Sequence, residues 1–419
     1  MKILVTLEEH LWRADDGHIY GHGPASYSAT SELLDTFDEV VLLARVERGK
    51  NLRPGHNRFD GPSISIYELP NYTGPWEYLR KLSPLSVGVQ QAVAQCDLYL
   101  LRVPGLISRL AWQEIRRAKR AYAAQVVTDP ADALGAGTMR SFFRPLYRYV
   151  AIRNLRKICT QASALLYCSK NVLPHRYPPS KGSYSAFSPW VVLTQGYATP
   201  ELMAQRQLRI DEISSSYRHQ ARPLVLGFIG SFAQLYKGAD TLLRALSLCS
   251  RRGLEFKAFF VGEGRYRSAI QSFAADLSIH EKTVFVGQLS FGKPIFDFLD
   301  SLDLFLMPSR AEAFGRALLE AMSRGCPCIG SNVGGIPEML GPDALVSPGD
   351  HKALAQKILE VTADPARLKA MSQRNLAKAK EFDPEIHRHV RRAFYRYVRD
   401  HGASNAKSGR KRQSTLQPL

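Results

Sequence analysis

Two glutamates eight residues apart are the first candidates for chemistry in this chain. Glu312 and Glu320 stand in the stretch PSRAEAFGRALLEAM, the first among small and polar residues and the second within an apolar helical pattern. A carboxylate accepts hydrogen bonds from two neighbouring hydroxyls at once. Because eight residues of helix rise about 12 Å, the pair could hold the hydroxyls of two sugar rings in one extended ligand. The alternative is two solvent-facing glutamates, with the first near the positive end of a helix dipole.

A lysine precedes a second predicted helix. In LGFIGSFAQLYKGADTLLRAL a strand is expected to end at Gly230 and a helix to begin near Asp240, with Lys237 just before it. An ammonium group beside the free N–H groups of a helix start makes a good phosphate site. Lysine before glycine near a helix is also common by chance. The stretch VGGIPEM at 333–339 could present N–H groups to an anion in the same way, although a tight turn is the favoured interpretation of this stretch by itself.

Length and composition indicate a folded protein of two domains. The chain has 419 residues, which is too long for one ordinary hydrophobic core. Of these residues, 45% are hydrophobic and 22% charged, as in a folded globular protein. Its six cysteines include no CxxC pair, which is typical of reduced thiols in a cytosol, and Cys326-Pro-Cys328 lacks the further ligands that zinc requires. The opening MKILVTLEEH is not expected to be a secretory signal, and no apolar run approaches about 20 residues. We therefore predict a cytoplasmic protein.

The charge balance is unusual. The formal net charge is +18, and no acidic residue occurs from Ala133 to Pro200. A basic solvated face, an anionic membrane surface and nucleic acid are the candidate explanations, of which nucleic acid is the least favoured. Peripheral attachment to the inner face of a membrane is therefore one hypothesis for this segment. Its cations and aromatic or apolar neighbours include Arg140, Arg144, Arg148, Arg153, Arg156, Lys157, Phe142, Phe143, Leu146, Tyr147 and Tyr149.

The pattern of apolar runs predicts an α/β fold. Short β-rich runs alternate with helical patterns in both halves, which indicates two Rossmann-like, doubly wound domains facing each other across a cleft. The expected strands are 2–7, 39–46, 98–103, 124–129, 164–169, 224–230, 256–264, 283–289, 302–309, 327–332 and 344–348. The expected helices are 28–37, 86–95, 109–123, 239–253, 265–277, 315–325, 352–364 and 385–400.

The same pattern divides the chain. We predict an N-terminal acceptor-binding domain at 1–205, a linker at 206–222 and a C-terminal domain at 223–378 that binds the activated ligand. A helix at 379–400 is expected to pack back on the first domain, before a disordered basic tail at 401–419. Ligands of such sheets bind beyond the carboxyl ends of the strands, where the candidate residues lie.

With these residues in view, the second half resembles the retaining glycosyltransferases of family 4, the group 1 glycosyl transferases of the GT-B fold. The resemblance rests on GFIGSFAQLYKGADTLLRAL, FFVGEG, VFVGQLS, the long stretch from LDLFLMPSRAEAFG to GGIPEML, and ALVSPGD. It is strong over about 226–350. It implies transfer of a hexose, with retained configuration, from a UDP- or GDP-sugar to a saccharide or lipid-linked acceptor, without a metal or other cofactor. LLRVPGLISRLA and TDPADAL are similar to a subgroup that builds bacterial surface polysaccharides.

The resemblance also implies roles for single residues. Glu320 matches the glutamate that holds the donor ribose, and Glu312 the one that contacts the transferred sugar near the backbone of Phe314 and Gly315. Lys237 matches a lysine on the donor diphosphate, whose developing charge it would stabilise. The predicted donor-binding set is completed by Gly230, Ser231, Arg316 and Gly23, and by Gly287 and Gln288 where the nucleobase docks.

The chain departs from the family pattern at three places. Ser231 stands where an arginine usually follows the glycine, so one diphosphate cation is missing, and Arg310 or Arg316 could substitute for it. TDPADAL stands where many members have a histidine near the reacting sugar, so an acid, Asp129 or Asp132, could take that place, and Asp129 is the candidate catalytic residue. GHIYGHGPAS replaces an early glycine pair, and its Gly23 could line the cleft.

Other functions remain open. A GT-B epimerase or phosphorylase shares helix-start phosphate sites, although no lysine is marked for pyridoxal phosphate. A non-catalytic, basic membrane-binding module is a second alternative. An NAD-dependent dehydrogenase is disfavoured, because no GxGxxG follows the first strand with an acid about 20 residues later.

Overall fold

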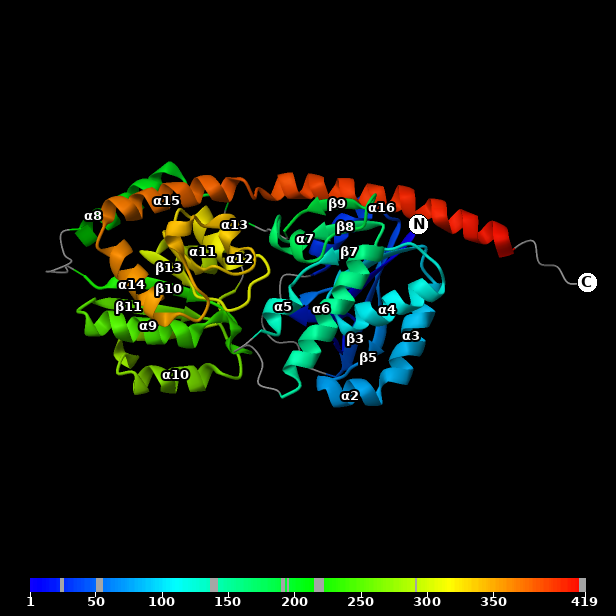
Figure 1. The fold of residues 1–419 in the computed structure, drawn as a ribbon, viewed down its shortest axis with the longest axis horizontal. Helices are drawn as coiled ribbons and strands as arrows, with labels where there is room; N and C mark the ends of the chain where they lie inside the picture. The colour runs from blue at the N-terminus through cyan, green and yellow to red at the C-terminus, as the bar shows by residue number, and fades with distance from the viewer. Residues whose placement is uncertain are drawn as a thin grey trace, which may run out of the picture.

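Two α/β domains form the molecule. The computed structural model describes residues 1–22, 26–49, 56–135, 142–189, 193, 196–214, 222–290 and 292–413. The domains lie end to end along the longest axis, and the final helix runs along the N-terminal one (Figure 1). This arrangement matches the fold class expected from the alternation of strands and helices.

The N-terminal domain is built on a largely parallel sheet. Its parallel strands run in the order β5-β3-β1-β6-β7-β8-β9, and β2 and β4 extend the far end of β1 as an antiparallel ribbon. The strand bounds are β1 Lys2–Arg13, β2 Ile19–His22, β3 Glu39–Arg48, β4 His56–Arg58, β5 Ile64–Pro70, β6 Leu98–Val103, β7 Ala123–Val126, β8 Ala164–Tyr167 and β9 Tyr184–Phe187.

Apolar side chains alternate between the two faces of this sheet. In β1, Ile3 and Val5 enter one buried cluster and Leu4 enters the other, as the two-residue period of a strand requires. The helices of the domain are α1 Tyr27–Thr30, η1 Ser31–Asp35, α2 Gly74–Arg80, α3 Leu82–Ala94, α4 Leu106–Arg117, α5 Pro130–Ala133, α6 Arg144–Gln161 and α7 Val172–Arg176.

The C-terminal domain has a wholly parallel sheet in the order β12-β11-β10-β13-β14-β15. Numbered within the domain this order is 3-2-1-4-5-6, that of a Rossmann fold, with its switch point between β10 and β13. The strands are β10 Leu224–Ile229, β11 Phe256–Val261, β12 Thr283–Gly287, β13 Leu304–Met307, β14 Cys328–Ser331 and β15 Leu345–Val346. The helices are η2 Leu235–Lys237, α9 Ala239–Arg251, α10 Arg267–Asp276, η3 His280–Lys282, α11 Lys293–Asp300, α12 Arg316–Ser323, α13 Ile336–Met339, η4 Pro342–Ala344, α14 His351–Thr362 and α15 Pro365–Lys380.

The segment expected to be a linker is partly a helix of the C-terminal domain. Helix α8 spans Pro200–Ser214, and its Ile210 and Ile213 are buried in the C-terminal core. The buried guanidinium of Arg206 donates to the carbonyl oxygen of Leu302 at 2.6 Å and to those of Leu299 and Arg324 at 3.2 Å. The predicted boundary at 205 was therefore wrong, because a charged, polar stretch here packs one apolar edge and one arginine against the domain that follows.

The last helix links the two domains. Helix α16, Pro384–Gln413, buries Phe394 and Tyr395 in the N-terminal core, and Arg391 forms an ion pair with Glu32 at 2.8 Å. Its backbone stays helical through Gln413, so the expectation of disorder from 401 is not met over 401–413, a stretch without proline. Among the described residues, no helix is both long and apolar enough to cross a bilayer.

Candidate active site

The predicted residues gather at the switch point of the C-terminal sheet. The loop after β10 carries Gly230, Ser231 and Lys237, and the loop after β13 carries Glu312. Because β10 and β13 are neighbours whose helices lie on opposite faces of the sheet, their loops diverge and leave a crevice. The residues that could bind a ligand therefore come from the one edge of the sheet where such crevices form.

Two glycines allow the loops of this edge to touch. Gly238 has φ +78°, and a Cβ built on it would lie 2.0 Å from the carbonyl oxygen of Pro308. A Cβ on Gly334, which has φ +55°, would lie 1.4 Å from the carbonyl oxygen of Glu312. Any other residue would push the loops apart, so these glycines fix the spacing of the site. The stretch VGGIPEM thus acts here as a tight turn against the Glu312 loop.

Lys237 and Glu312 meet in an ion pair. Lys237 Nζ donates to Glu312 Oε2 at 2.6 Å, and the two side chains are 19% and 10% exposed. Burial is the largest single influence and would lower the pKa of Lys237, but the charge and hydrogen bond of Glu312, together with Tyr236, outweigh it and hold that pKa above its ordinary value. The lysine is therefore a charged ammonium at neutral pH. The two residues predicted to contact the diphosphate and the transferred sugar are adjacent.

Arg310 is not available as a substitute for the missing arginine at 231. Its Nη1 and Nη2 donate to the two carboxylate oxygens of Asp240 at 2.8 and 2.6 Å. Further bonds reach the hydroxyl of Thr241 and the carbonyl oxygen of Leu235. A bidentate pair of this kind is strong and directional, and it ties the β13 loop to the first turn of α9. Arg310 is thus a structural residue, and that half of the prediction was wrong.

Arg316 is placed differently. It is the first residue of α12, is exposed, and has no hydrogen bond or ion pair within the described part of the chain. Its positive charge is near enough to lower the pKa of both Lys237 and Glu320. Helix α12 begins at Arg316, directly after Gly315, which has φ +101°. Glu312 therefore lies in the loop before the helix and is not one helical turn from Arg316.

Glu320 lies inside α12 with no hydrogen-bond partner for its carboxylate among the described residues. It is 9% exposed, and burial raises the pKa of its carboxyl group from 4.5 to about 7, although the charge of Arg316 opposes the rise. Polar groups so deeply buried normally have partners. A buried carboxylate without one is destabilising in the free protein and is a candidate for binding a ligand.

The remaining predicted residues lie around this centre. Gly230 directly follows β10, and exposed Ser231 accepts a hydrogen bond from the backbone N–H of Ala233 at 3.1 Å. Gly287 ends β12 at the edge of the sheet with φ +88°, and Gln288 beyond it is exposed. The side chain of Phe314 is buried against Phe382, which leaves only its backbone for a ligand. Gly23 lies outside the described residues.

A cavity of about 330 Å³ opens between the domains beside Glu312. The C-terminal domain contributes the loops that carry Gln234, Tyr236 and Glu312, and the N-terminal domain contributes the end of β7 and α5. Its described lining residues are Thr128, Asp129, Asp132, Ala133, Gln234, Tyr236, Ala311, Glu312 and Ala313. A ligand in this cavity would touch both domains.

Asp129 is engaged by the protein itself. Its Oδ1 accepts from the hydroxyl of Tyr177 at 2.5 Å and from the backbone N–H of Ala131 at 2.8 Å, and its Oδ2 accepts from Arg176. It caps α5 and ties α5 to α7, which gives it a positioning role. These contacts do not support the prediction of a catalytic acid at Asp129. The sequence gave no sign of the distant partners that engage this side chain.

Asp132 has the available carboxylate oxygen that was expected of Asp129. Its Oδ2 is buried in the cavity wall without a hydrogen-bond partner in the described structure. Burial, with help from the charge of Asp129, raises the pKa of Asp132 above its ordinary value despite the ion pair with Arg176 at 2.9 Å. TDPADAL was singled out for both aspartates, but only the structure separates their roles.

Glu338, a residue that sequence reasoning missed, joins the two domains. Glu338 in α13 accepts the backbone N–H groups of Lys170 at 2.7 Å, Asn171 at 2.8 Å and Val172 at 3.3 Å, at the start of α7. The carboxylate of one domain thus caps a helix of the other. The GGIPE sequence carried this glutamate, but nothing in it indicated a partner.

In the N-terminal domain, the N–H groups at the start of α4 are already occupied by a side chain of the protein. Glu8 Oε1 accepts from the backbone N–H groups of Ile107 at 2.8 Å and Ser108 at 3.2 Å in the first turn of α4. A Cβ on Gly105 would lie 2.0 Å from the same oxygen. Burial raises the pKa of Glu8 to about 7, against the effect of these hydrogen bonds. By contrast, α9 and α12 have glycine N-caps with no side chain on their N–H groups.

Comparison with known proteins places this site in a family. The model of the "Glycosyl transferases group 1" family matches residues 209–378, the β10–α15 region with the last part of α8. Residues 209–378 are therefore similar to the group 1 glycosyl transferases. The matched region contains Lys237, Glu312 and Glu320, the residues on which the resemblance was based.

The relatives and structural neighbours extend beyond this domain. Protein CapJ of Staphylococcus aureus is 22% identical over 340 residues, covering 80% of each chain. The GDP-mannose-dependent monoacylated α-(1-6)-phosphatidylinositol monomannoside mannosyltransferase of Corynebacterium glutamicum is 29% identical over 232 residues, 52% of this chain and 58% of that protein. Sucrose-phosphate synthase of Thermosynechococcus elongatus has a TM-score of 0.67 at 18% identity, with 95% of this chain and 98% of that one covered.

A further solved structure is that of Anabaena HepE in complex with UDP and glucose. It matches with a TM-score of 0.63 at 18% identity, covering 93% of this chain and 97% of that one. The two domains of the chain therefore have the GT-B fold of these glycosyltransferases, as the sequence resemblance implied. The likeness of fold covers 95% and 93% of the chain in these two comparisons and so includes the N-terminal domain.

Proposed function

We propose that this glycosyltransferase moves a hexose, with retained configuration, from a nucleotide sugar to a saccharide or lipid-linked acceptor, in the synthesis of a bacterial surface polysaccharide or glycolipid. The observation that carries the proposal is the Lys237–Glu312 pair at 2.6 Å, on the wall of a cavity shared by both domains, with the unpartnered carboxylate of Glu320 in the following helix. In the proposal Glu320 would hold the ribose, Lys237 the diphosphate and Glu312 the transferred sugar, the three consecutive parts of a nucleotide sugar.

The donor would bind along the edge of the C-terminal sheet. The ribose hydroxyls would donate to Glu320 and so supply its missing hydrogen bonds. The base would lie toward Gly287 and Gln288 at the end of β12. Lys237, together with the uncapped N–H groups at the starts of α9 and α12, would face the diphosphate.

Arg316 is the second cation of this proposal. Ser231 removes the arginine expected after Gly230, and Arg310 is held by Asp240. Arg316 is exposed, lacks a partner among the described residues and is electrostatically coupled to Lys237 and Glu320. As the glycosidic bond breaks, negative charge grows on the departing diphosphate, and both cations would stabilise it more than they stabilise the bound donor.

The acceptor would enter from the N-terminal side of the cavity. Asp132 Oδ2 is placed there without a partner, so it could accept a hydrogen bond from the attacking hydroxyl. Asp129 is engaged by Tyr177 and Arg176 and would not act as a nucleophile. This is consistent with transfer on one face of the sugar, in which the donor phosphate itself takes the proton and the configuration is retained.

A donor screen tests the proposal. Thermal shift and calorimetry with UDP, GDP and ADP identify the base, and the matching sugar donors are then incubated with candidate lipid-linked and saccharide acceptors. We expect one diphosphate to bind, a Glu320→Gln variant to lose that binding, and a Glu281→Gln variant, whose glutamate is exposed in η3, to keep it. Conversion of the nucleotide sugar into an isomer without an acceptor would instead indicate an epimerase and contradict the proposal.

A further inference from the structure

The long helix α6 of the N-terminal domain presents an exposed surface that the transfer reaction does not use. It spans Arg144–Gln161, and only Leu155, Ile158 and Cys159 on one side of it are buried. The opposite side carries residues at helical spacing, from Leu146 through Tyr149, Val150 and Arg153 to Lys157. A helix with so narrow a buried stripe leaves most of its circumference to an environment outside the domain.

Apolar side chains are concentrated at the start of this helix. Among the described residues, six of the fifteen exposed large hydrophobic side chains lie between 142 and 150. Phe142 is 92% exposed and Tyr149 61% exposed. The six side chains, which we call the apolar tip, are Phe142, Phe143, Leu146, Tyr147, Tyr149 and Val150. Contiguous exposed apolar side chains of this kind mark an interaction surface rather than ordinary solvent-facing residues.

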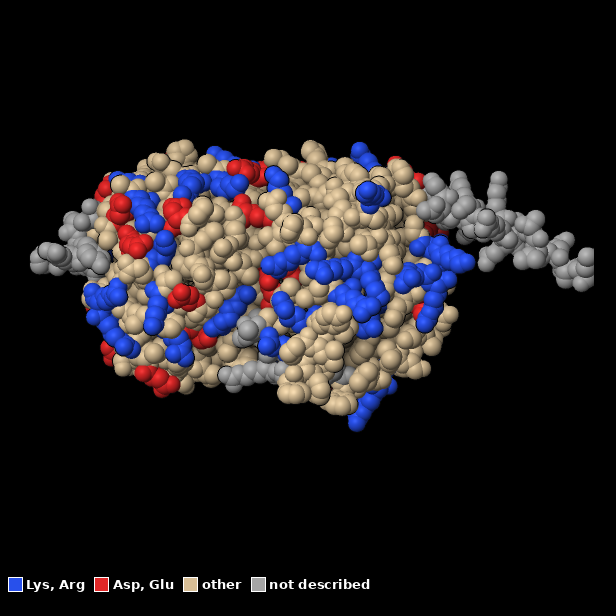
Figure 2. Space-filling model, in the orientation of Figure 1, with Lys and Arg blue, Asp and Glu red and all other residues tan. Residues whose placement is uncertain are grey.

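Cations follow the apolar tip along the same helix. Arg153, Arg156 and Lys157 line a hollow of about 360 Å³ with Tyr149, Ile152 and Thr160. None of the three is in an ion pair within the described chain, and the segment from 133 to 200 offers no acid. Figure 2 shows lysine and arginine gathered over the part of the N-terminal domain where α6 lies in Figure 1. The hollow is therefore a site of uncompensated positive charge.

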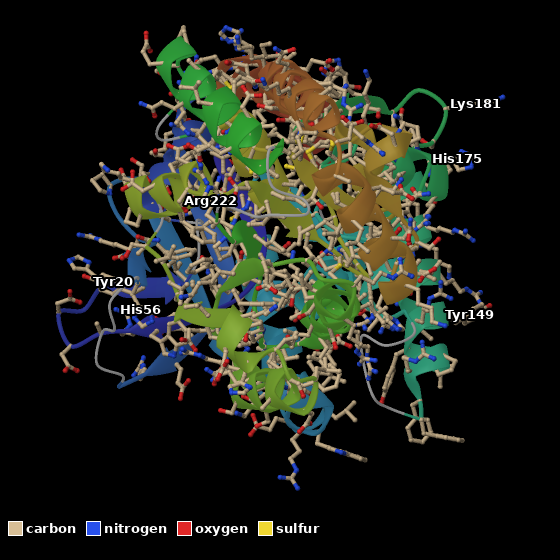
Figure 3. The ribbon with its side chains drawn as sticks, turned by 90° about the vertical axis from the view of Figure 1, so that its left-hand side faces the viewer. Tyr20, His56, Tyr149, His175, Lys181 and Arg222 are labelled. Carbon is tan, nitrogen blue, oxygen red and sulfur yellow. The ribbon has the colours of Figure 1, made fainter. Side chains whose placement is uncertain are left out.

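The surface extends beyond α6. Tyr149 points outward on the same side of the molecule as His175 and Lys181, and Tyr20 and His56 lie on the opposite side (Figure 3). His175 and Lys181 are both exposed. One side of the N-terminal domain thus combines the apolar tip with the cations of α6 and with Lys181 beyond them.

From these observations we infer that the apolar tip and the cations of α6 dock the protein on an anionic bilayer surface. The tip would enter the interface, where aromatic rings are favoured, and Arg153, Arg156 and Lys157 would contact lipid phosphates beside it. Aliphatic Leu146 and Val150 favour acyl chains over nucleic acid, since bases stack on aromatic rings and gain little from branched aliphatic groups. Arg144 and Arg148 lie within the span of the tip, but they donate to the carbonyl oxygens of Leu134 and Ala131, so the cations offered to lipid phosphates follow the tip along the helix.

The docking surface adjoins the cleft. Arg148 Nε donates to the carbonyl oxygen of Ala131 at 2.8 Å, in the short helix α5 whose Asp132 and Ala133 line the cavity. A bilayer held against α6 would therefore face the acceptor side of the cleft rather than the donor side. This inference stands apart from the proposed transfer reaction, because docking requires no turnover.

Vesicle sedimentation tests the inference. The full chain is mixed with vesicles of phosphatidylcholine, with or without about one-third phosphatidylglycerol, at about 50 mM and about 500 mM NaCl. We expect binding to the anionic vesicles at low salt and its loss at high salt. Because each cation near such a surface strengthens binding about fivefold, the variant Arg153→Gln/Arg156→Gln/Lys157→Gln should bind about 100-fold more weakly.

Two further variants make the result specific. Phe142→Ser/Phe143→Ser should weaken binding about tenfold or more, since the exposed rings would supply buried apolar area in the bilayer. A matched control, Arg251→Gln/Lys257→Gln/Lys352→Gln, removes three exposed cations from the C-terminal domain and should bind as the unmodified chain does. Circular dichroism melts verify that every variant is folded.

Three results would overturn the inference. The first is vesicle binding that is indifferent to lipid charge, and the second is an equal loss of binding in the control variant and in the α6 variant. The third is α6-dependent binding to a soluble polyanion such as heparin without binding to anionic vesicles, which would assign the surface to an acidic polymer. Loss of nucleotide binding in the donor screen would leave this test unaffected.

Discussion

Replacement of Glu320 by glutamine should stabilise the ligand-free protein while it removes nucleotide binding. Burial raises the pKa of Glu320 from 4.5 to about 7 in the folded chain. Because the folded pKa is above the unfolded one, the contribution of this group to stability is fully present below about pH 4.5 and is lost as the pH rises through about 7. A rise of this size corresponds to about 3 kcal/mol of unfolding free energy. Glutamine has no charge to bury, so it avoids the loss.

Urea denaturation at pH 5 and pH 8, followed by fluorescence without nucleotide, measures this difference. At pH 8 we expect Glu320→Gln to unfold at a higher urea concentration than the unmodified chain, with an unfolding free energy greater by up to about 3 kcal/mol. This gap in unfolding free energy should shrink toward pH 5. Glu281→Gln, at an exposed position, should show no such gap at either pH. Calorimetry with the nucleotide identified by the donor screen should show its affinity rising from pH 6 to pH 8 in the unmodified chain, because the ionised carboxylate is the better hydroxyl acceptor.

The two halves of this prediction fail in different ways. Equal unfolding free energies of Glu320→Gln and the unmodified chain at both pH values would mean that the carboxylate is not desolvated as the structure indicates. Greater stability with unchanged nucleotide affinity would mean that the carboxylate is buried but has no part in binding. Either result refutes the reasoning that links the cost of burying Glu320 to its use by a ligand.

Four more substitutions divide the proposed roles. Lys237→Ala should lower kcat about 100- to 1000-fold and change donor affinity much less, in steady-state kinetics, because the lysine acts mainly on charge that develops in the transition state; a change confined to KM would contradict this. Arg316→Ala should weaken binding of the nucleoside diphosphate about tenfold in calorimetry and binding of the monophosphate little. Equal losses of affinity for the two nucleotides would exclude a contact between Arg316 and the diphosphate. Arg310→Ala should instead lower the free energy of unfolding. Asp132→Asn should reduce transfer about tenfold or more with unchanged donor affinity, since it faces the acceptor side; normal transfer rates would remove it from the site.

Much of the C-terminal domain could be predicted from local patterns. Its strands read as continuous apolar runs and its loops carry glycines, so the order of elements and the place of Lys237 and Glu312 followed without tertiary information. Adjacent loops at a switch point are a property of the topology. For this reason the gathering of Lys237 and Glu312 at one edge of the sheet is the part of the site that sequence anticipated best.

The errors arose where partners lie far away in the chain. Helix α8 looked like a linker because its packing depends on Arg206 reaching carbonyl groups about 100 residues later. Asp129 looked available because its partners Arg176 and Tyr177 are nearly 50 residues away. Neither contact leaves a periodic signal in sequence. The same is true of Glu338, whose partners belong to the other domain.

Short elements were also missed for a local reason. The strand β9, Tyr184–Phe187, has only four residues, and β5 at Ile64–Pro70 mixes polar and apolar residues because it lies at the edge of its sheet. Edge strands are half-exposed and lack the apolar run that identifies central ones. These strands affect the width of the N-terminal sheet but not the position of the site.

The central claim is most directly tested by a crystal structure of the chain with its nucleoside diphosphate. The account predicts both ribose hydroxyls within hydrogen-bond distance of the Glu320 carboxylate, with Lys237 Nζ on the diphosphate. A nucleotide bound elsewhere, with Glu320 still unpartnered and the Lys237–Glu312 pair unchanged at 2.6 Å, would contradict it.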